Sequence, residues 1–412
     1  MNKKDNSMKK LILILIITIA ACRNSSDNQP KDLRIIDVEG GVGKGRLVKL
    51  SEIAESIEYI PLETNSEAVV GKIFFDRIFY EKGFFYLMEQ NRTIIIHDND
   101  GKYFNKINKL GRGPQEYDAA FTVDIDLTTG NISVLASNKI IEYSIDGDFK
   151  RVMNYKDDGF LSKHYITRFI KSDLKYFLLS TINDRSQHSG FLIDSSSRLL
   201  LSVEYPGEDY EKVTTYSALL SIMNPMIFRH KNAVRIKNGL NKYILTINED
   251  NSIDTAYIFN FGKYAPDPLK RDHFRVYAPF IYSQFSIFES DQYLFMTFHT
   301  GSLSEKPAKM IGLNSREYVY NFECSVFNKK TGEFQFILQP EINQLGFVED
   351  FEGGPAVWPK YVSSDGYLIT YLYAHEFKAH AETHEVSERF KQIAHSLKDT
   401  DNPVIVRVKL KN

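Results

Sequence analysis

The chain has 412 residues and a formal charge of −2 at pH 7, and 43% of its residues are apolar. This is the composition of a folded globular protein, and its 29 Phe and 24 Tyr favour β-strands. The lack of a cationic excess argues against a nucleic-acid-binding protein, and two cysteines, Cys22 and Cys324, are too few for a disulfide framework or a cysteine metal site.

Residues 1–21 have the features of a secretory signal peptide. Four lysines in the first ten residues precede an apolar run over residues 11–21. This run is shorter than the roughly 20 residues that a membrane-spanning helix needs, and it ends in small residues. The stretch IAAC at 19–22 resembles a bacterial lipobox, which implies cleavage before Cys22 and acylation of Cys22. An uncleaved membrane anchor is the alternative.

Residues 22–46 are assigned to the lipid-attachment cysteine and a flexible tether, because the stretch RNSSDNQPKD is polar and has no apolar period. Residues 47–412 are assigned to one domain. We therefore expect an extracytoplasmic protein that lipid holds to a bacterial membrane. The outer membrane is the predicted place, on its periplasmic side or at the cell surface.

One strand pattern recurs along residues 47–412. GFFYLMEQ and RTIIIHDNDGKYFNKI read as strand, strand, Asp-Gly turn and strand, and NISVLAS with KIIEYSIDGDFKRVM repeats the order 46 residues later. Further turns are expected at 194–197, at 249–252 and at Thr331-Gly332. Four strands every 40–50 residues, about the length of a propeller blade, predict a β-propeller.

The predicted fold is all-β, a six-bladed β-propeller with four-stranded antiparallel blades. The expected innermost strands begin near Phe75, Phe121, Tyr165, Ile227, Phe285 and Lys360. The segment at 46–63 is expected to pair with the last blade and close the ring. Apolar residues at helical spacing (Phe377, Ala381, Phe390 and Ile393) predict a helical insertion in the last blade.

The stretch GRGPQEY at 111–117 is interpreted as a connector between two blades. A phosphate-binding loop needs a strand before it and a helix after it, and no helical pattern follows here. Gly111 and Gly113 are expected at positive φ. Arg112, Glu116 and Tyr117 either contact a ligand at a propeller face or form a buried Arg–Glu pair with the tyrosine beneath it; the structural interpretation is favoured.

The connector GxGPxEY after a strand–Asp-Gly–strand hairpin resembles the six-bladed β-propeller lipoproteins of Bacteroidetes-type bacteria. The opening segment LSEIAESIEYIPLET at 50–64 and the lipobox resemble the same family. The resemblance covers most of residues 47–412 and relates the architecture to NHL-repeat and TolB-like propellers. It implies a propeller fold and no settled activity, and the insertions leave the blade boundaries within 262–412 open.

Charged residues on the predicted inner strands form the main candidate site. They are Arg77, Asp124, Arg168, Arg229 and His230. Inner strands line the channel of a propeller. The three arginines would repel one another there unless Asp76, Asp124 and Asp126 pair with them. A residual positive field would bind an anionic or polyhydroxyl ligand; the alternative is a water-filled channel whose charges pair with each other.

His380 and His384 are four residues apart on the predicted helix, which is a spacing that metal ligands use. No third ligand is evident, so surface histidines are the favoured interpretation, and no cofactor is assigned. We expect a binding protein for a small molecule, a glycan or a partner protein. The alternative is a metal-assisted lyase or hydrolase of the NHL type, which would need several ligands around the channel, whereas His230 is the one histidine on the expected inner strands.

Overall fold

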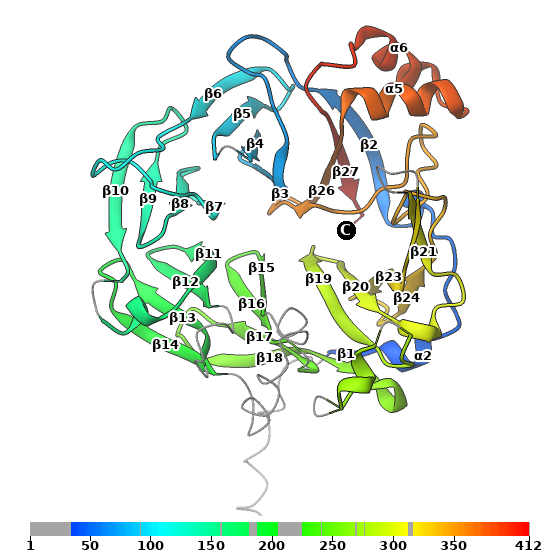
Figure 1. Ribbon diagram of the computed structural model, residues 1–412, viewed down its shortest axis with the longest axis horizontal. Coiled ribbons are helices and arrows are strands. Elements are labelled where there is room, and N and C mark those ends of the chain that lie inside the picture. The colour runs from blue at the N-terminus through cyan, green and yellow to red at the C-terminus, as the bar shows by residue number, and fades with distance from the viewer. Residues whose placement is uncertain are drawn as a thin grey trace, which may run out of the picture. The chain divides into compact units, whose positions relative to one another are not determined.

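Six antiparallel β-sheets stand radially around a central channel in the computed structural model (Figure 1). The structure describes residues 34–411, with gaps at 91, 157–158, 181–187, 205–224, 240, 268–269, 276 and 312–315. The sheets belong to one unit, Ile35–Asn412. The predicted six-bladed propeller is therefore confirmed.

The first three blades follow one another in chain order, each with its first strand at the channel. Blade 1 contains β3 (Ile73–Glu81), β4 (Phe84–Glu89), β5 (Ile94–Asp98) and β6 (Tyr103–Ile107). Blade 2 contains β7 (Thr122–Ile125), β8 (Ile132–Leu135), β9 (Lys139–Tyr143) and β10 (Phe149–Asn154). Blade 3 contains β11 (Ile166–Ser172), β12 (Lys175–Ser180), β13 (His188–Asp194) and β14 (Leu199–Glu204).

The last three blades depart from the simple order of four consecutive strands. Blade 4 contains β15 (Met226–His230), β16 (Ala233–Lys237), β17 (Tyr243–Ile247), β18 (Ile253–Asn260) and a fifth strand, β1 (Arg34–Asp37). Blade 5 contains β19 (Tyr282–Glu289), β20 (Tyr293–His299), β23 (Phe322–Asn328) and β24 (Phe334–Ile337), with a hairpin of β21 (Ala308–Ile311) and β22 (Glu317–Tyr320) inserted after β20. Blade 6 contains β25 (Tyr361–Val362), β26 (Tyr367–Leu372), β27 (Val404–Leu410) and β2 (Ala54–Pro61).

The predicted hairpin turns lie between the third and fourth strands of blades 1 to 5. One residue in each turn has a positive φ, between 64° and 85°. These residues are Gly101, Gly147, Ser197, Asn251 and Gly332. Glycine and short polar side chains tolerate this left-handed conformation, so the turns follow from local sequence.

The N-terminal segment runs along the outer rim of three blades. β1 pairs with β18 of blade 4, the amide of Arg46 donates to the Phe336 carbonyl of blade 5 at 3.2 Å, and β2 pairs with β27 of blade 6. The predicted ring closure by the 46–63 segment is thus found. Residues 34–46 were assigned to the tether, yet Ile36 and Val38 are fully buried, so the packed part begins before residue 47.

Blades pack face to face through apolar side chains, which no blade could bury alone. Between blades 1 and 2, for example, Tyr86 and Ile96 pack against Val123, Val134 and Ile141, all at most 2% exposed. Interlocking faces of this kind hold the inner strands in fixed positions around the channel.

Two helices, α5 (Ala374–Thr383) and α6 (Glu388–Ser396), form the predicted insertion between β26 and β27. They lie over β2 at the rim (Figure 1). The ring of Phe377 stacks on that of Phe390 at 3.9 Å, and both meet the edge of Tyr59 in β2. Within the described residues, no helix is long and apolar enough to cross a membrane.

Candidate functional site

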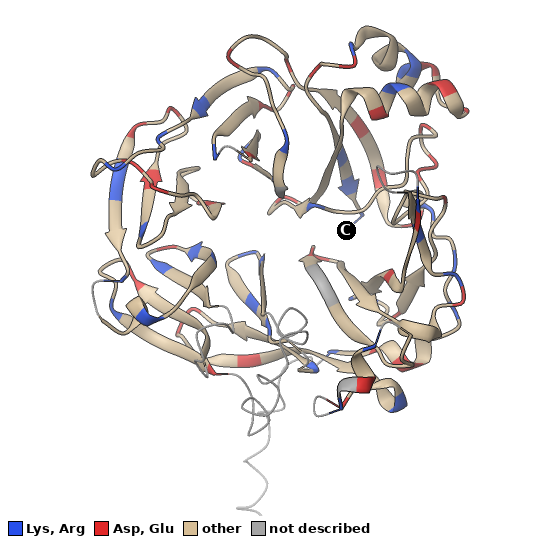
Figure 2. Cartoon of the chain, in the orientation of Figure 1, with Lys and Arg blue, Asp and Glu red and all other residues tan. Residues whose placement is uncertain are grey.

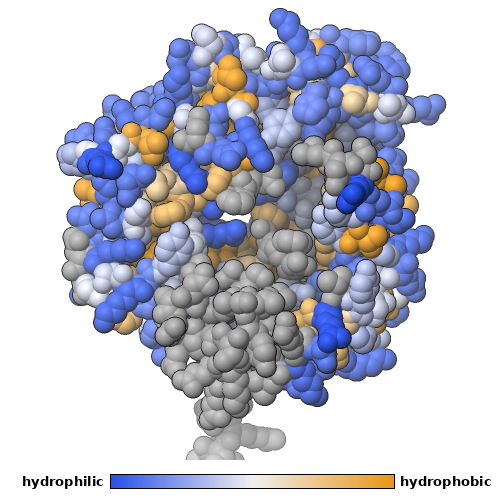
Figure 3. Space-filling view, viewed as in Figure 1, coloured by the Kyte–Doolittle hydropathy of each residue, from blue (hydrophilic) through white to orange (hydrophobic). Residues whose placement is uncertain are grey.

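A cavity of about 370 Å³ occupies the centre of the ring. Its wall includes residues from the innermost strands of all six blades, β3, β7, β11, β15, β19 and β25. Figure 3 shows the channel opening at the middle of the molecule. Residues of both charge signs occur on the strands around it (Figure 2).

Five of the residues proposed from the sequence line this cavity. They are Arg77, Asp124, Arg168, Arg229 and His230. Arg112, Glu116 and Tyr117 are not part of the cavity wall. The structure therefore separates the two candidate groups: the inner-strand charges share a cavity, and the connector loop lies elsewhere.

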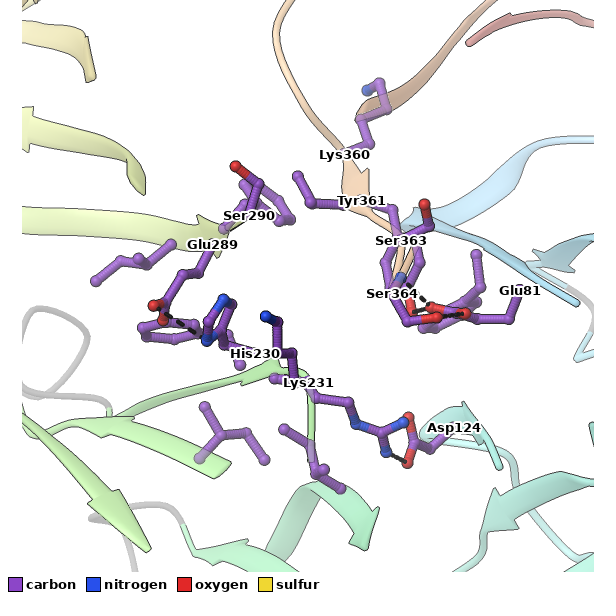
Figure 4. A pocket seen from close by; sticks show the side chains of 18 of the residues that line it. Glu81, Asp124, His230, Lys231, Glu289, Ser290, Lys360, Tyr361, Ser363 and Ser364 are labelled. Carbon is purple, nitrogen blue, oxygen red and sulfur yellow. Dashed lines mark hydrogen bonds and ion pairs between the residues drawn. The ribbon is translucent and has the colours of Figure 1, made fainter. Parts of the chain in front are cut away.

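Arg229 is neutralised by Asp124 within the wall. Its Nη2 donates to Asp124 Oδ2 at 2.5 Å (Figure 4), and its Nη1 donates to the Ile125 carbonyl at 3.2 Å. The amide of Lys171 also donates to Asp124 Oδ2, at 2.7 Å. Burial raises the pKa of Asp124, against the opposing influence of Arg229. The pair joins blades 2 and 4, so this arginine does not supply a free positive charge.

Arg77 and Arg168, unlike Arg229, have no carboxylate partner among the described residues. Neither forms a hydrogen bond or ion pair with a protein acceptor in the part of the chain that the structure describes, which does not include the side chain of Asp76. Burial lowers the pKa of Arg77 to about 9, with Arg168 and Arg92 acting in the same direction. Arg168 is exposed to the channel yet enclosed by its walls, and this burial lowers its pKa too. Arginine side chains stay protonated in proteins, so both bring a positive charge to the channel.

Irregularities in the inner strands accompany both arginines. Between Ile73 and Ile78, five steps along β3 correspond to two steps along β4. Between Ile166 and Arg168, two steps along β11 correspond to one along β12. Bulges of this kind change the direction of a side chain and occur often beside functional sites. The sequence pattern does not predict these bulges.

His230 sits among carboxylates at the blade 4–blade 5 junction. Its Nε2 is 3.2 Å from Asp291 Oδ1 and its Nδ1 is 3.5 Å from Glu289 Oε1 (Figure 4). Glu289 also pairs with Lys329 at 3.0 Å and with Arg235 at 3.1 Å. Burial lowers the pKa of His230. Both ring nitrogens are thus engaged with protein groups.

Glu81 is a channel residue that the sequence analysis missed. Its carboxylate accepts from the Tyr361 hydroxyl at 2.8 Å and from the Ser364 amide and hydroxyl at 2.9 and 2.5 Å (Figure 4). Burial raises its pKa. The partners belong to blade 6, so only the closed ring brings them to Glu81. A glutamate at the end of a strand looks ordinary in the sequence.

The charges are distributed unevenly along the channel. In a blade of four antiparallel strands, three strands separate one inner strand from the next, so the inner strands run the same way. Arg77 and Arg168 each lie four residues before the end of their strands, β3 and β11, whereas Glu81 and Glu289 are the last residues of β3 and β19. Arg77 and Arg168 therefore lie farther than Glu81 and Glu289 from the end of the channel where the inner strands finish.

The connector at 111–117 joins β6 of blade 1 to β7 of blade 2, as expected. Tyr117 is fully buried and its hydroxyl donates to the Arg92 carbonyl at 3.0 Å, while Glu116 Oε2 accepts from the Gly113 amide at 2.8 Å. Two details of the expectation are wrong. Gly111 and Gly113 are not among the positive-φ glycines, and Arg112 is exposed and forms no pair with Glu116.

A side chain at either glycine of the connector would instead meet the side chain of Glu116. A Cβ atom on Gly111 would lie 2.0 Å from Glu116 Oε2, and one on Gly113 would lie 3.1 Å from the same atom. The carboxylate therefore folds over the loop backbone, and side-chain contact, not backbone conformation, explains this part of the motif.

His380 and His384 are satisfied by protein groups. Their rings stack at 4.0 Å, His380 Nε2 is 2.9 Å from the Gly353 carbonyl and His384 Nε2 is 3.1 Å from Glu341 Oε2. Across the described residues, no three or more His, Cys, Asp or Glu side chains are grouped to hold a metal ion.

Cys22, the predicted lipid-attachment site, lies outside the described residues.

Comparison with known proteins gives a family and a fold. The family model described as "Domain of unknown function (DUF4934)" matches residues 33–409. No curated protein matches the chain in sequence. The crystal structure of a Bacteroides fragilis protein inferred to be exported is similar, with a TM-score of 0.64 at 14% identity, over 92% of this chain and 100% of that chain.

Two further solved structures are more distant. A DUF4221 family member from Bacteroides vulgatus has a TM-score of 0.47 at 14% identity, over 87% of this chain and 98% of that chain. An inactive virginiamycin B lyase from Staphylococcus aureus, bound to quinupristin, has a TM-score of 0.38 at 12% identity, over 86% and 99%. Identities this low show a shared fold alone, and these two structures carry no argument about the chemistry of this chain.

Proposed function

Because the chain belongs to the DUF4934 family, whose function is unknown, its role must be inferred from its own residues, and we propose that it is an exported, lipid-anchored β-propeller that binds a small molecule in its central channel. A glycan fragment of suitable size is included in this class. A folded partner protein is too large for the channel itself.

The cavity carries this proposal. Its volume of about 370 Å³ falls within the range of roughly 300–1,000 Å³ that small-molecule sites occupy. Apolar side chains on its wall, among them Phe79, Ile170 and Phe288, alternate with charged and hydroxyl groups such as Arg168 and Ser363. Apolar surface with a few converging polar groups is the usual composition of a ligand site.

The anchor rests on the N-terminal sequence. The cationic start, the short apolar run and the IAAC stretch at 19–22 support export and acylation of Cys22. The likeness of fold to a Bacteroides protein inferred to be exported agrees with this.

The alternative activity, a metal-assisted lyase or hydrolase, stays a hypothesis, because no cluster of metal-binding side chains among the described residues favours it.

The proposal is tested by finding a ligand and then locating it. The purified full-length protein is screened by differential scanning fluorimetry against sugars, uronic acids, aromatic acids and uncharged aromatic compounds. A ligand at 100 times its Kd stabilises a protein by about 2.7 kcal/mol, which raises the melting temperature measurably. Hydrogen-exchange mass spectrometry then compares free and ligand-saturated protein.

We expect protection in the inner strands, above all in β3, β11 and β15, with the outer strands β6, β14 and β18 unchanged. Protection confined to the rim, for example to the β21–β22 hairpin, would move the binding function to the surface and contradict the channel proposal. A complete screen without any stabilising compound would also count against it.

A further inference from the structure

We infer that the channel ligand carries an anionic group, which is held between Arg77 and Arg168 with Arg92 behind them. This inference rests on the proposed channel-binding function and adds the charge and orientation of the ligand. The chemical class is a small organic monoanion: a carboxylate or sulfonate on an apolar or hydroxylated body.

Arg77 and Arg168 differ from four other arginines among the described residues. Arg151, Arg229, Arg235 and Arg407 each contact a carboxylate, at 2.9, 2.5, 3.1 and 2.5 Å. Arg77 and Arg168 line the cavity, and within the described part of the chain no acceptor pairs with either. An enclosed charge is costly unless a counter-charge accompanies it. A ligand anion would supply that counter-charge.

Arg92 provides an independent observation. Its Nη1 atom is buried and has no hydrogen-bond acceptor among the described residues. Its guanidinium lies 3.5 Å from the centre of the Phe74 ring, and that of Arg77 lies 5.4 Å from the same ring. A buried donor without an acceptor in a folded protein calls for an unobserved partner, such as a water or an ion. Here that donor belongs to the same group of cations.

The three guanidinium groups also disfavour one another. Burial lowers the pKa of Arg77, and the charges of Arg168 and Arg92 lower it further. Like charges that are held together in a partly dry space repel, and an anion between them removes this repulsion. Arg77 and Arg92 both lie against the Phe74 ring in the free protein, so this part of the site is preorganised for an anion.

The rest of the channel determines the orientation. Toward its other end, Glu289 is paired with Lys329 and Arg235, and Asp291 is 3.0 Å from Lys231. A second anionic group placed there would meet carboxylates whose cations are already engaged. The anionic group should therefore point toward Arg77 and Arg168, and the uncharged body should lie against the apolar wall.

The experiment uses a matched pair of probes, naphthalene-2-sulfonate and the uncharged naphthalene-2-sulfonamide. Their rings are the same, so their difference in affinity reports the charge. Binding of each probe to the full-length protein is measured by isothermal titration calorimetry. Three variants are compared: Arg77→Gln, Arg168→Gln and, as a control with the same loss of charge outside the channel, Arg112→Gln.

We expect the sulfonate to bind at least tenfold more tightly than the sulfonamide. Arg77→Gln and Arg168→Gln should each weaken the sulfonate about tenfold and leave the sulfonamide unchanged, and the sulfonate affinity should fall with rising salt. Arg112→Gln should change neither. Both channel variants should also melt at or above the wild-type temperature, since each removes an unpaired charge; this result excludes misfolding as the cause of weaker binding.

The outcomes separate the two proposals. Equal affinity for both probes, unaffected by Arg77→Gln and Arg168→Gln, would overturn the anion inference and leave the channel-binding function standing. A loss of sulfonate binding in Arg112→Gln alone would overturn it as well and assign the anion to the connector loop. No binding of either probe, together with no ligand from the screen, would overturn both proposals.

Discussion

Glu116 organises the connector between the first two blades at the scale of single residues. Its carboxylate accepts from the Gly113 amide and covers Gly111, while Tyr117 beneath it hydrogen-bonds to the Arg92 carbonyl. Arg92 is one of the cations behind the channel. The connector and the proposed anion site therefore share a neighbour, although the connector does not line the cavity.

This arrangement predicts coupling between Gly111→Ala and Glu116→Ala. A Cβ at Gly111 would displace the Glu116 carboxylate and break its bond to Gly113, so either single change should cost about 1 kcal/mol. In the Glu116→Ala background the clash is gone, and Gly111→Ala should be neutral or stabilise by about 0.5 kcal/mol. Urea denaturation of the four proteins measures the cycle; additive effects would show that the glycine is needed for another reason.

Lys171 connects two blades at the scale of structural elements. Its Nζ is 2.6 Å from Asp126 Oδ2 and 2.8 Å from Glu142 Oε1, while Arg151 and Tyr176 also bond to Glu142. Burial would raise the pKa of both carboxylates, but hydrogen bonds, foremost from Lys171 to Asp126 and from Arg151 to Glu142, lower each to about 2. The network joins β9 and the residue that follows β7, both in blade 2, to β11 of blade 3.

The network predicts a loss of stability in acid. Both carboxylates have a pKa in the folded protein below their ordinary values of 3.8 and 4.5, so they stabilise the fold above those values and lose this effect as the pH falls toward 2. Solvent screening reduces the effect of these shifts on stability, so each carboxylate contributes on the order of 1–2 kcal/mol. The free energy of unfolding, measured between pH 5 and 2.5, should fall less steeply in Glu142→Gln than in the wild type. Identical slopes would mean that the pKa of Glu142 is the same in the folded and the unfolded protein.

The helical insertion supports ring closure through one aromatic cluster. Phe390 stacks on Phe377 and meets Tyr59 of β2, the strand that closes the ring. Phe390→Ala should lower the free energy of unfolding by about 3–4 kcal/mol, because it leaves a cavity where the helices cover β2. Lys391→Ala, which removes an exposed contact to Glu388, should cost less than about 0.5 kcal/mol. Equal effects in urea denaturation would show that the insertion is loosely packed.

At the scale of the whole molecule, the proposed anchor predicts the behaviour of Cys22→Ser. The variant should lack lipid and leave the membrane fraction, because each buried methylene of an acyl chain contributes about 0.8 kcal/mol to membrane binding. Cys324→Ser is the matched control, since Cys324 is buried in blade 5 and should leave acylation unchanged. Mass spectrometry of the N-terminal peptide and cell fractionation measure the result. A Cys22→Ser protein that stays in membranes without lipid would contradict the anchor.

The sequence by itself determined the blades, because strands and hairpin turns depend on neighbours along the chain. The alternation of apolar residues and the turn residues at Gly101, Gly147 and Gly332 set the six units and the inner strands. The helical insertion followed from the spacing of Phe377 and Phe390 in the same way. Local pattern also placed Arg77, Arg168 and Arg229 on inner strands, and hence at the channel.

Only the tertiary structure decided which of these charges is free. Arg229 meets Asp124 across 105 residues and Glu81 meets Ser364 across 283, so the closed ring, not the sequence pattern, makes these pairs. Bulges in β3 and β11 accompany the two arginines that no described carboxylate neutralises. Residues 34–46 pack onto the propeller because Ile36 and Val38 are buried against apolar side chains of blades that lie far away in the sequence. Pairing and burial depend on groups that are far apart in the chain. The local sequence pattern does not show which of these groups become neighbours in space.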